Sequence, residues 1–219
     1  MARVRKRKRL SGGDRRAQLI EVGRRVFALR GYDAASMEEI ATRAKVTRPI
    51  VYTHFGDKEG VFKAVVEIET AELERRIVDA VSSGPPRQRL ERAALSFLSY
   101  VRDRPDGFRI LSDERAPAVA GDRAAQQLVD AVAERVARVI GVEFEQQGFD
   151  PATAPIYAYG VTGLMIYVAR WWSTVREPPV EAVAAHVAAL CWNGFANLPR
   201  RPAVGGDAEK KKGTTDEHR

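Results

Sequence analysis

Apolar residues recur every three or four positions along almost the whole chain of 219 residues, which is the repeat of one face of an α-helix. In residues 14–30, Leu19, Ile20, Val26 and Phe27 fall on one side of such a helix and charged residues fall opposite. Gly31 is expected to end this helix, as a C-cap glycine does. We therefore predict an all-α protein of about nine helices.

Start and stop signals divide the front of the chain into short helices. Ser36 and Glu39 have the spacing of a capping box, so a second helix begins there and runs to about Ala44. Pro49 suits the first turn of a third helix, where its missing N–H has no partner to lose, and Gly56 ends that helix. Two short helices joined by so brief a turn predict a helix-turn-helix, whose second helix can lie in a DNA major groove.

The third predicted helix separates into an apolar and a polar side. We expect Ile50, Val51 and Phe55 to point toward the core. The other faces then carry Arg48, Pro49, Tyr52, Thr53 and His54. A DNA groove presents phosphate oxygens and base edges, which hydroxyls, a ring with a polar tip and arginine can contact. Asp57 is the expected cap of a fourth helix. Lys58 begins that helix, where free backbone N–H groups favour a phosphate.

Positive charge is concentrated at the front of the chain. Residues 1–60 hold 15 Lys and Arg against 7 Asp and Glu, although the whole chain carries a net charge of only +7. Such a basic run is often only a solvated arm. Beside a helix-turn-helix, however, we expect Arg5, Arg7 and Arg9 to reach phosphates or the minor groove.

The stretch "GYDAASMEEIATRAKVTRPIVYTHFGDKEGVF" resembles the tetracycline repressor (TetR) family of bacterial transcription regulators. The matching positions are Gly31, Tyr32, Ser36, Ile40, Ala41, Ala44, Val46, Thr47, Tyr52, His54, Phe55, Lys58 and Phe62. The resemblance implies phosphate contacts by Ser36, Thr47, Tyr52, His54 and Lys58, and base-facing positions at Arg48, Pro49 and Thr53. Pro49 and Val51 stand where the family often has glycine or alanine and leucine, and Pro49 therefore changes the groove-facing surface.

Structural roles remain open for three of these residues. Ser36 can be a helix cap as well as a phosphate donor, because the N-terminal N–H groups stay available nearby. His54 can be a structural histidine between the third and fourth helices. Tyr52 can be partly buried, but its hydroxyl then still needs a partner.

Residues 151–169 carry no charge and approach the length of a membrane span. Prolines, glycines, threonines and tyrosines dilute their apolar content, so we favour a buried helix of a soluble protein that also meets an oligomer interface. In the family, the last two long helices form a four-helix dimer interface, and the eighth and ninth helices are the candidates here. Residues expected at the interface or in the core are Met165, Trp171, Trp172, Trp192 and Phe195.

The middle helices carry residues that can line a ligand cavity, as the family's pockets do, with plain core packing as the competing interpretation. These candidates are Phe97, Tyr100, Phe108, Leu111, Tyr157, Met165, Tyr167 and Trp171. The resemblance implies that a small effector there holds the recognition helices at a separation unsuited to DNA. The mainly apolar lining suggests a lipophilic effector.

We do not expect an enzyme or a cofactor. The chain has only three histidines and one cysteine for a catalytic or metal site. Its sequence contains no phosphate-binding loop of the GxxxxGKS kind. The lone Cys191 and the lack of an apolar stretch behind the basic N-terminus favour a cytoplasmic location and no membrane partner.

The sequence thus predicts a transcriptional repressor that binds a palindromic operator as a homodimer and is released by an effector. The expected organisation is a disordered basic arm (1–13), a helix-turn-helix DNA-binding domain (14–60), a helical ligand-binding and dimerisation domain (61–198) and a disordered tail (199–219). The alternative is a non-specific module that binds nucleic acid or an acidic surface through the basic arm.

Overall fold

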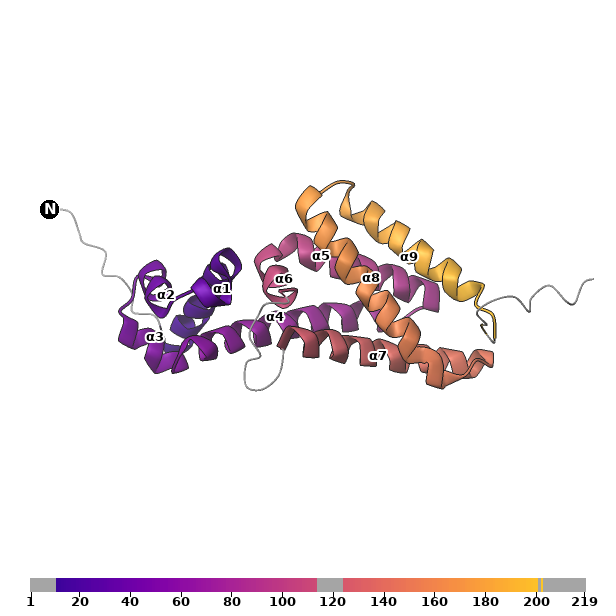
Figure 1. Cartoon of the computed structure of the whole chain (residues 1–219), viewed down its shortest axis with the longest axis horizontal. Coiled ribbons are helices and arrows are strands. Elements are labelled where there is room, and N and C mark those ends of the chain that lie inside the picture. The colour runs from indigo at the N-terminus through magenta and orange to yellow at the C-terminus, as the bar shows by residue number, and fades with distance from the viewer. Residues whose placement is uncertain (1–10, 114–123, 201, 203–219) are drawn as a thin grey trace, which may run out of the picture.

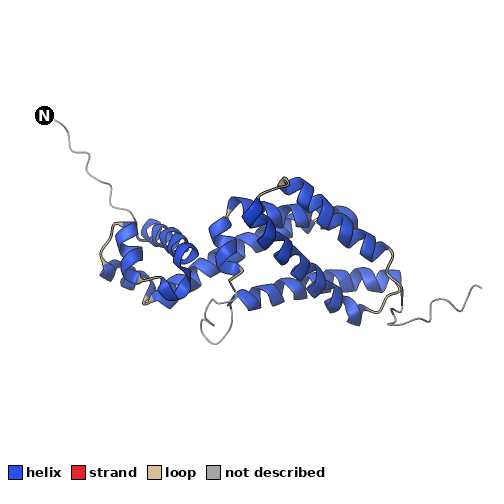
Figure 2. Ribbon diagram, turned by 45° about the horizontal axis from the view of Figure 1, so that its top comes forward, coloured by secondary structure: helices blue, strands red, loops and turns tan. Residues whose placement is uncertain are grey.

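The computed structural model describes residues 11–113, 124–200 and 202, and within these ranges every regular element is a helix (Figure 2). The elements are α1 (Gly12–Ala34), α2 (Met37–Ala44), α3 (Arg48–Phe55), α4 (Lys58–Val81), α5 (Pro86–Asp103), α6 (Pro105–Leu111), α7 (Ala124–Gln147), a 3₁₀ turn η1 (Pro151–Thr153), α8 (Ala154–Val175) and α9 (Val180–Ala196). The predicted all-α fold is confirmed. Arg5, Arg7 and Arg9 lie outside the described residues, as does most of the predicted tail.

The helices form two groups joined by α4. Figure 1 shows α1, α2 and α3 together at one end, while α4 runs from them into the group formed by α5 to α9. Within the larger group, α5 packs against α4 and α9, and α7 packs against α8. Helix α6 contacts α1 as well as α4, so it lies at the junction of the two groups.

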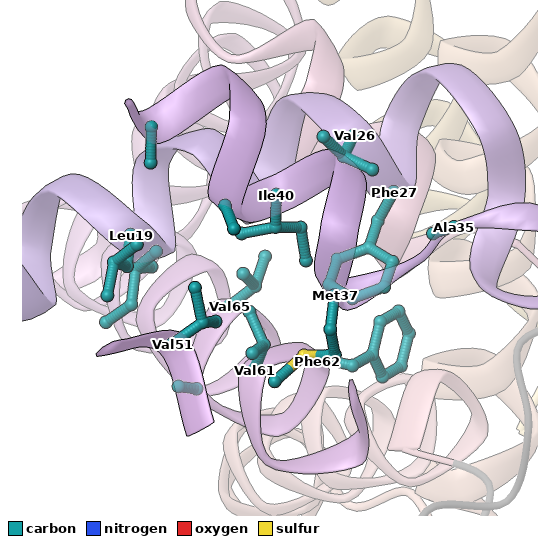
Figure 3. Packing of buried hydrophobic residues seen from close by; sticks show 14 of the residues in the cluster. Leu19, Val26, Phe27, Ala35, Met37, Ile40, Val51, Val61, Phe62 and Val65 are labelled. Carbon is teal, nitrogen blue, oxygen red and sulfur yellow. The ribbon is translucent and has the colours of Figure 1, made fainter. Parts of the chain in front are cut away.

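The smaller group is built on a continuous apolar core (Figure 3). The fully buried side chains come from all four of its helices: Leu19 and Val26 of α1, Ile40 of α2, Val51 of α3, and Val61 and Val65 of α4. Fully burying each such side chain stabilises the fold by about 1.5–3 kcal/mol. Because α4 supplies two of these residues, the smaller group is completed by the helix that leaves it.

Helix α1 begins slightly earlier than predicted, and hydrogen bonds connect its C-terminal end to α4. Ser11 caps it, since its Oγ accepts a hydrogen bond from the Asp14 N–H at 3.1 Å. Gly31, with φ 75°, interrupts the helix at the predicted stop, and a short helical turn follows. The Lys58 ammonium donates to the backbone carbonyls of Tyr32 (3.0 Å) and Asp33 (3.2 Å), which fastens the start of α4 to this turn.

The corner between α3 and α4 is tightly closed. Asp57 caps α4, with its Oδ1 accepting from the Gly60 N–H at 2.7 Å. A Cβ atom at Gly60 would lie 2.1 Å from the carbonyl oxygen of Phe55, so only glycine fits there. The two helices are therefore in direct backbone contact across the corner.

The larger group has its own apolar core and includes the uncharged segment near residue 151. Asp150 caps the turn η1 through a 2.9 Å hydrogen bond from the Ala152 N–H, so the helical conformation begins there in 3₁₀ form. Residues 151–175 are long and apolar enough to cross a membrane by length and composition alone. In the structure, Ala158, Ala169 and Trp172 on one side of α8 are buried, and the opposite side is exposed.

Candidate nucleic-acid interface

Backbone hydrogen bonds fix the turn between α2 and α3. The Ser36 Oγ accepts from the Glu39 N–H at 3.1 Å, which confirms the predicted cap of α2. At the other end, Lys45 adopts the left-handed conformation (φ 56°, ψ 46°), and the Val46 N–H donates to the Ala41 carbonyl at 3.0 Å. This closed turn is the common helix-ending motif, and it sets the angle at which α3 departs.

Helix α1 holds both helices of the helix-turn-helix at their C-terminal ends. The Arg16 guanidinium donates to the His54 carbonyl at 2.9 Å and lies 4.5 Å from the centroid of the Phe55 ring. Gln18 donates to the Ala44 carbonyl at 3.2 Å. A positive group at the C-terminus of α3 also complements the helix dipole. The orientation of α3 is thus tied to α1.

The outer side of α3 carries the polar residues expected there. Arg48, Pro49 and Thr53 are exposed, and the Tyr52 side chain is 41% exposed. Thr47 precedes the helix and is exposed, and its hydroxyl makes no capping hydrogen bond. These groups form one surface at the end of the molecule, which we call the α3 face.

Arg48 already has partners on the α3 face. Its Nη2 lies 3.4 Å from the Tyr52 hydroxyl, and its Nη1 lies 3.8 Å from a carboxylate oxygen of Glu38. The hydrogen bond to Tyr52 raises the pKa of Arg48, with further contributions from the charges of Tyr52 and Glu38. Exposed pairs of this kind are weak. Arg48 can therefore exchange these partners for acceptors on another molecule.

Three predicted site residues have side chains that also make contacts within the protein. His54 is half-buried, and its ring centroid lies 6.2 Å from that of Phe55, so a structural role accompanies any contact it makes outside. Thr53 uses its hydroxyl to donate to the Pro49 carbonyl at 2.8 Å. The ammonium of Lys58 turns toward the end of α1, as described above.

The expectation that Ile50 points inward is wrong, because its side chain is 37% exposed. Helix α3 has only two turns, and among its residues only Val51 is fully buried while Phe55 is half-buried. Successive helical residues are rotated by about 100°, so a buried stripe this narrow excludes Ile50. Ile50 thus belongs to the outer surface of α3, next to the polar residues.

The predicted ligand residues do not gather around one cavity. Tyr100, Phe108 and Leu111 are buried in the second apolar core, and Phe97 and Met165 pack against it. Tyr157 lies between two rings, with centroid distances of 5.2 Å to Phe144 and 5.9 Å to Phe195. A cleft of about 260 Å³ lies elsewhere, between α1, Phe62 of α4 and the end of α6, and its lining includes none of these candidates.

Trp171 corrects the cavity prediction, because its side chain is 52% exposed on the outer side of α8. One stripe along α8 has members at intervals of three and four residues: the exposed Ile156, Tyr159, Tyr167 and Trp171, and the half-buried Gly163. Leu190 is the large exposed apolar residue of α9. Among the described residues, no other element lies within 4 Å of a Cβ at Gly160, Gly163 or Gly194, so another surface can approach closely there. We call this surface the α8–α9 face.

The described residues outside these two faces provide neither a metal site nor a reactive cysteine. Among the described residues, no group of three or more His, Cys, Asp and Glu side chains is placed to hold a metal ion. Cys191 is buried in the second core, and this burial raises the pKa of its thiol. A neutral, buried thiol is a poor nucleophile.

Comparisons with known proteins match both helical groups. Residues 19–65 match the family model described as bacterial regulatory proteins, tetR family, and residues 83–195 match the tetracyclin repressor-like C-terminal domain. The HTH-type transcriptional activator FasR of Mycolicibacterium smegmatis is 29% identical over 198 residues, covering 87% of each chain. The HTH-type transcriptional repressor DhaR of a Mycobacterium species is 33% identical over 78 residues, covering 35% of this chain and 39% of DhaR.

A solved structure agrees with these sequence matches. The crystal structure of a TetR-like transcriptional regulator from Rhodococcus sp. RHA1 superposes with a TM-score of 0.73 and 26% sequence identity. The superposition covers 86% of this chain and 100% of the Rhodococcus chain, so both helical groups take part in it.

Proposed function

The chain belongs to the tetR family of bacterial regulatory proteins, and we propose that it is a cytoplasmic regulator that binds a palindromic operator as a homodimer. The α3 face carries this proposal. It combines arginine, hydroxyls and an aromatic ring on a short helix whose C-terminal end is held by α1 and α4. Such a helix can enter the major groove while its neighbours contact the backbone.

The proposed contacts divide into two sets. Ser36, Thr47, Tyr52, His54 and Lys58 are assigned to phosphates, and Arg48, Pro49 and Thr53 are assigned to base edges. Ile50 joins the second set, because an exposed apolar side chain can contact a thymine methyl group. The long contacts of Arg48 with Tyr52 and Glu38 support a base-reading role, since a guanine edge offers two acceptors in exchange for these two weak partners.

The α8–α9 face is the proposed dimer interface. Its aromatic and aliphatic side chains stand exposed beside glycines that permit close approach, which suits a second copy of the same surface. A two-fold axis there carries two α3 faces, and two such helices read half-sites about 34 Å apart along the DNA. An operator with an inverted repeat follows from that symmetry.

An effector is proposed to bind a more open state of the α5 to α8 core, because the candidate residues do not surround one cavity in this structure. These candidates are Phe97, Tyr100, Phe108, Leu111, Tyr157 and Met165. The apolar chemistry of these side chains supports a lipophilic molecule. Effector and operator would bind different states of one dimer, so each lowers the affinity for the other. Repression is the proposed outcome of operator binding; of the two relatives compared, FasR is an activator and DhaR a repressor.

Selection from random duplex DNA followed by sequencing tests the proposal. The expected result is an inverted repeat whose half-sites lie about one helical turn apart. Recovery of unrelated sequences would contradict sequence-specific reading. A light-scattering measurement on the same sample must give the mass of a dimer.

The competing function is a non-specific module that depends on the basic arm. Deletion of residues 1–10 separates the two. Under our proposal, the deletion weakens binding and flattens its salt dependence but leaves the selected sequence unchanged. Loss of all binding after the deletion would favour the non-specific module.

A further inference from the structure

A buried carboxylate lies at the junction of the two helical groups. Glu69 sits in α4, between the segments matched by the two family models, and its side chain is only 1% exposed. Burying an ionised carboxylate is costly unless hydrogen bonds and opposite charges compensate it. The partners of Glu69 therefore indicate which elements it holds together.

The larger helical group supplies the hydrogen bonds. Glu69 Oε2 accepts from the Tyr100 hydroxyl at 2.9 Å and from Arg104 Nε at 2.8 Å, and Oε1 accepts from Arg104 Nη2. Burial raises the pKa of Tyr100, and the carboxylate raises it further. The hydrogen bond to Glu69 raises the pKa of Arg104. Tyr100 thus stays a neutral donor and Arg104 stays charged.

The smaller helical group supplies a second positive charge. Arg24 of α1 places its Nε 3.7 Å from Glu69 Oε1, and it also forms an ion pair with Glu21 on its own helix. The guanidinium is largely buried. Glu69 consequently links α1 to the residues at the end of α5, through charge rather than through an apolar contact.

Helix α6 packs directly onto this carboxylate. A Cβ atom at Gly107 would lie 2.0 Å from Glu69 Oε2 and 2.7 Å from the Tyr100 hydroxyl. Because a side chain at Gly107 would collide with Glu69, glycine is what lets α6 pack directly over the carboxylate. The position of α6 and the position of the carboxylate are therefore interdependent.

Helix α1 carries the link onward to α3. Arg24 is on the same uninterrupted helical segment as Arg16 and Gln18, which hold the C-terminal ends of α3 and α2. A change in the tilt of α1 against Glu69 must therefore move the α3 face with it.

We propose that Glu69 is a positioning residue for DNA reading, which sets the tilt of α1 and α3 against the larger helical group. In a dimer this tilt fixes the separation of the two α3 faces and so selects the spacing between operator half-sites. The inference rests on the proposed function, since it needs a dimer that reads two half-sites.

The test measures affinity for a series of operators whose half-sites are moved apart or together by one and two base pairs. The variants are Glu69→Gln, which removes the charge and keeps the shape, and Arg24→Met, which removes the charge on α1. Glu72→Gln is the matched control, because Glu72 lies on the same helix and binds Arg75 and Arg76 without contacting α1.

The wild type and Glu72→Gln are expected to prefer one spacing. For Glu69→Gln and Arg24→Met, affinity at that spacing falls about tenfold, in the usual range of coupling between sites, while affinity at neighbouring spacings changes less. The preference thus flattens. A merely structural role would lower affinity equally at every spacing, by reducing the folded fraction, and that result would overturn the inference.

Arg24→Met keeps the test decisive if Glu69→Gln fails to fold, because it leaves Glu69 bound to Tyr100 and Arg104. Circular dichroism and the mass of the dimer establish that each variant is folded. Folded Arg24→Met with an unchanged spacing preference overturns the inference while leaving the proposed function intact. A wild type that selects no inverted repeat overturns the proposed function itself.

Discussion

The α3 face and the α8–α9 face are both exposed, yet they differ in chemistry. The α3 face combines an arginine, hydroxyls and the Tyr52 ring on a short helix, and Pro49 and Ile50 are its exposed apolar side chains. The α8–α9 face presents rings, aliphatic side chains and glycines on two long helices. The first suits a charged and hydrated partner, and the second suits a surface that excludes water.

The exposure of a surface does not by itself identify the kind of partner that the surface binds. Large apolar residues scattered singly over a surface are ordinary, whereas a stripe at helical spacing marks an interaction site. Leu29 is 60% exposed on α1 and Leu190 is 63% exposed on α9, but only Leu190 belongs to the α8–α9 face, which includes the stripe on α8. The same substitution at each leucine therefore tests whether the α8–α9 face differs from ordinary exposed surface.

The largest effect is expected for Leu190→Arg. A charge in the centre of an apolar interface should weaken the dimer by about 2 kcal/mol or more, as hot-spot residues do. Sedimentation measures the dissociation constant, and operator binding should weaken with it. Leu29→Arg, the same change at almost the same exposure, should leave the dimer intact. Equal behaviour of the two variants would mean that the α8–α9 face is not the interface.

A smaller effect is expected for Arg48→Ala on the α3 face. Loss of a base contact should cost about 1–3 kcal/mol of operator affinity and relax the preference at one base position. Repeating the DNA selection with the variant measures this preference. Arg75→Ala removes an exposed arginine of α4 that is paired within its own helix, and it should change neither quantity. A variant that keeps the full base preference would rule out the assigned role of Arg48.

Tyr52→Phe should have a weaker and less selective effect. Removing one hydroxyl that contacts a phosphate should cost about 0.5–1.5 kcal/mol. Because phosphates carry no sequence information, titrations on matched and mismatched operators should show the same loss. Tyr167→Phe makes the same change on the α8–α9 face and should leave DNA affinity alone. A loss confined to the matched operator would instead assign Tyr52 to a base.

The smallest effect is expected for Lys45→Gly in the turn between α2 and α3. The left-handed conformation of Lys45 is strained for a residue with a side chain, although glycine gives the unfolded chain more freedom. We expect a net gain of about 0.5 kcal/mol or less in unfolding free energy, read from thermal melting. A clear fall in melting temperature would indicate that the Lys45 side chain itself stabilises the turn.

The sequence predicted well those features that depend on near neighbours. The cap at Ser36, the stop at Gly31 and the cap at Asp57 each involve atoms only a few residues apart, and all three are present in the structure. The limits of α3 follow from the same kind of signal. Local hydrogen bonds constrain the backbone wherever the residue types permit them.

Contacts between distant segments escaped prediction. Lys58 donates to carbonyls 26 and 25 residues away, and Glu69 meets Tyr100 and Arg104 at separations of 31 and 35 residues. In the sequence, Glu69 is one of several acidic residues along α4, and nothing distinguishes it from those that are exposed. Trp171 was misplaced for a related reason, since a helix apolar on every side does not reveal which side faces the core.

The corner at Gly60 has a mechanical consequence. Because the backbones of α3 and α4 touch there, α3 cannot rotate independently of α4. A movement of α4 therefore carries α3 with it, as a lever arm carries its tip. The stretch of α4 from Lys58 to Glu69, where the larger group holds the helix, spans about 17 Å at 1.5 Å per residue, so a pivot of about 10° there carries the tip about 3 Å. That travel is close to the rise of about 3.4 Å between stacked base pairs. In the proposed dimer, a small pivot of α4 would therefore shift each α3 helix by about one base-pair step along the DNA.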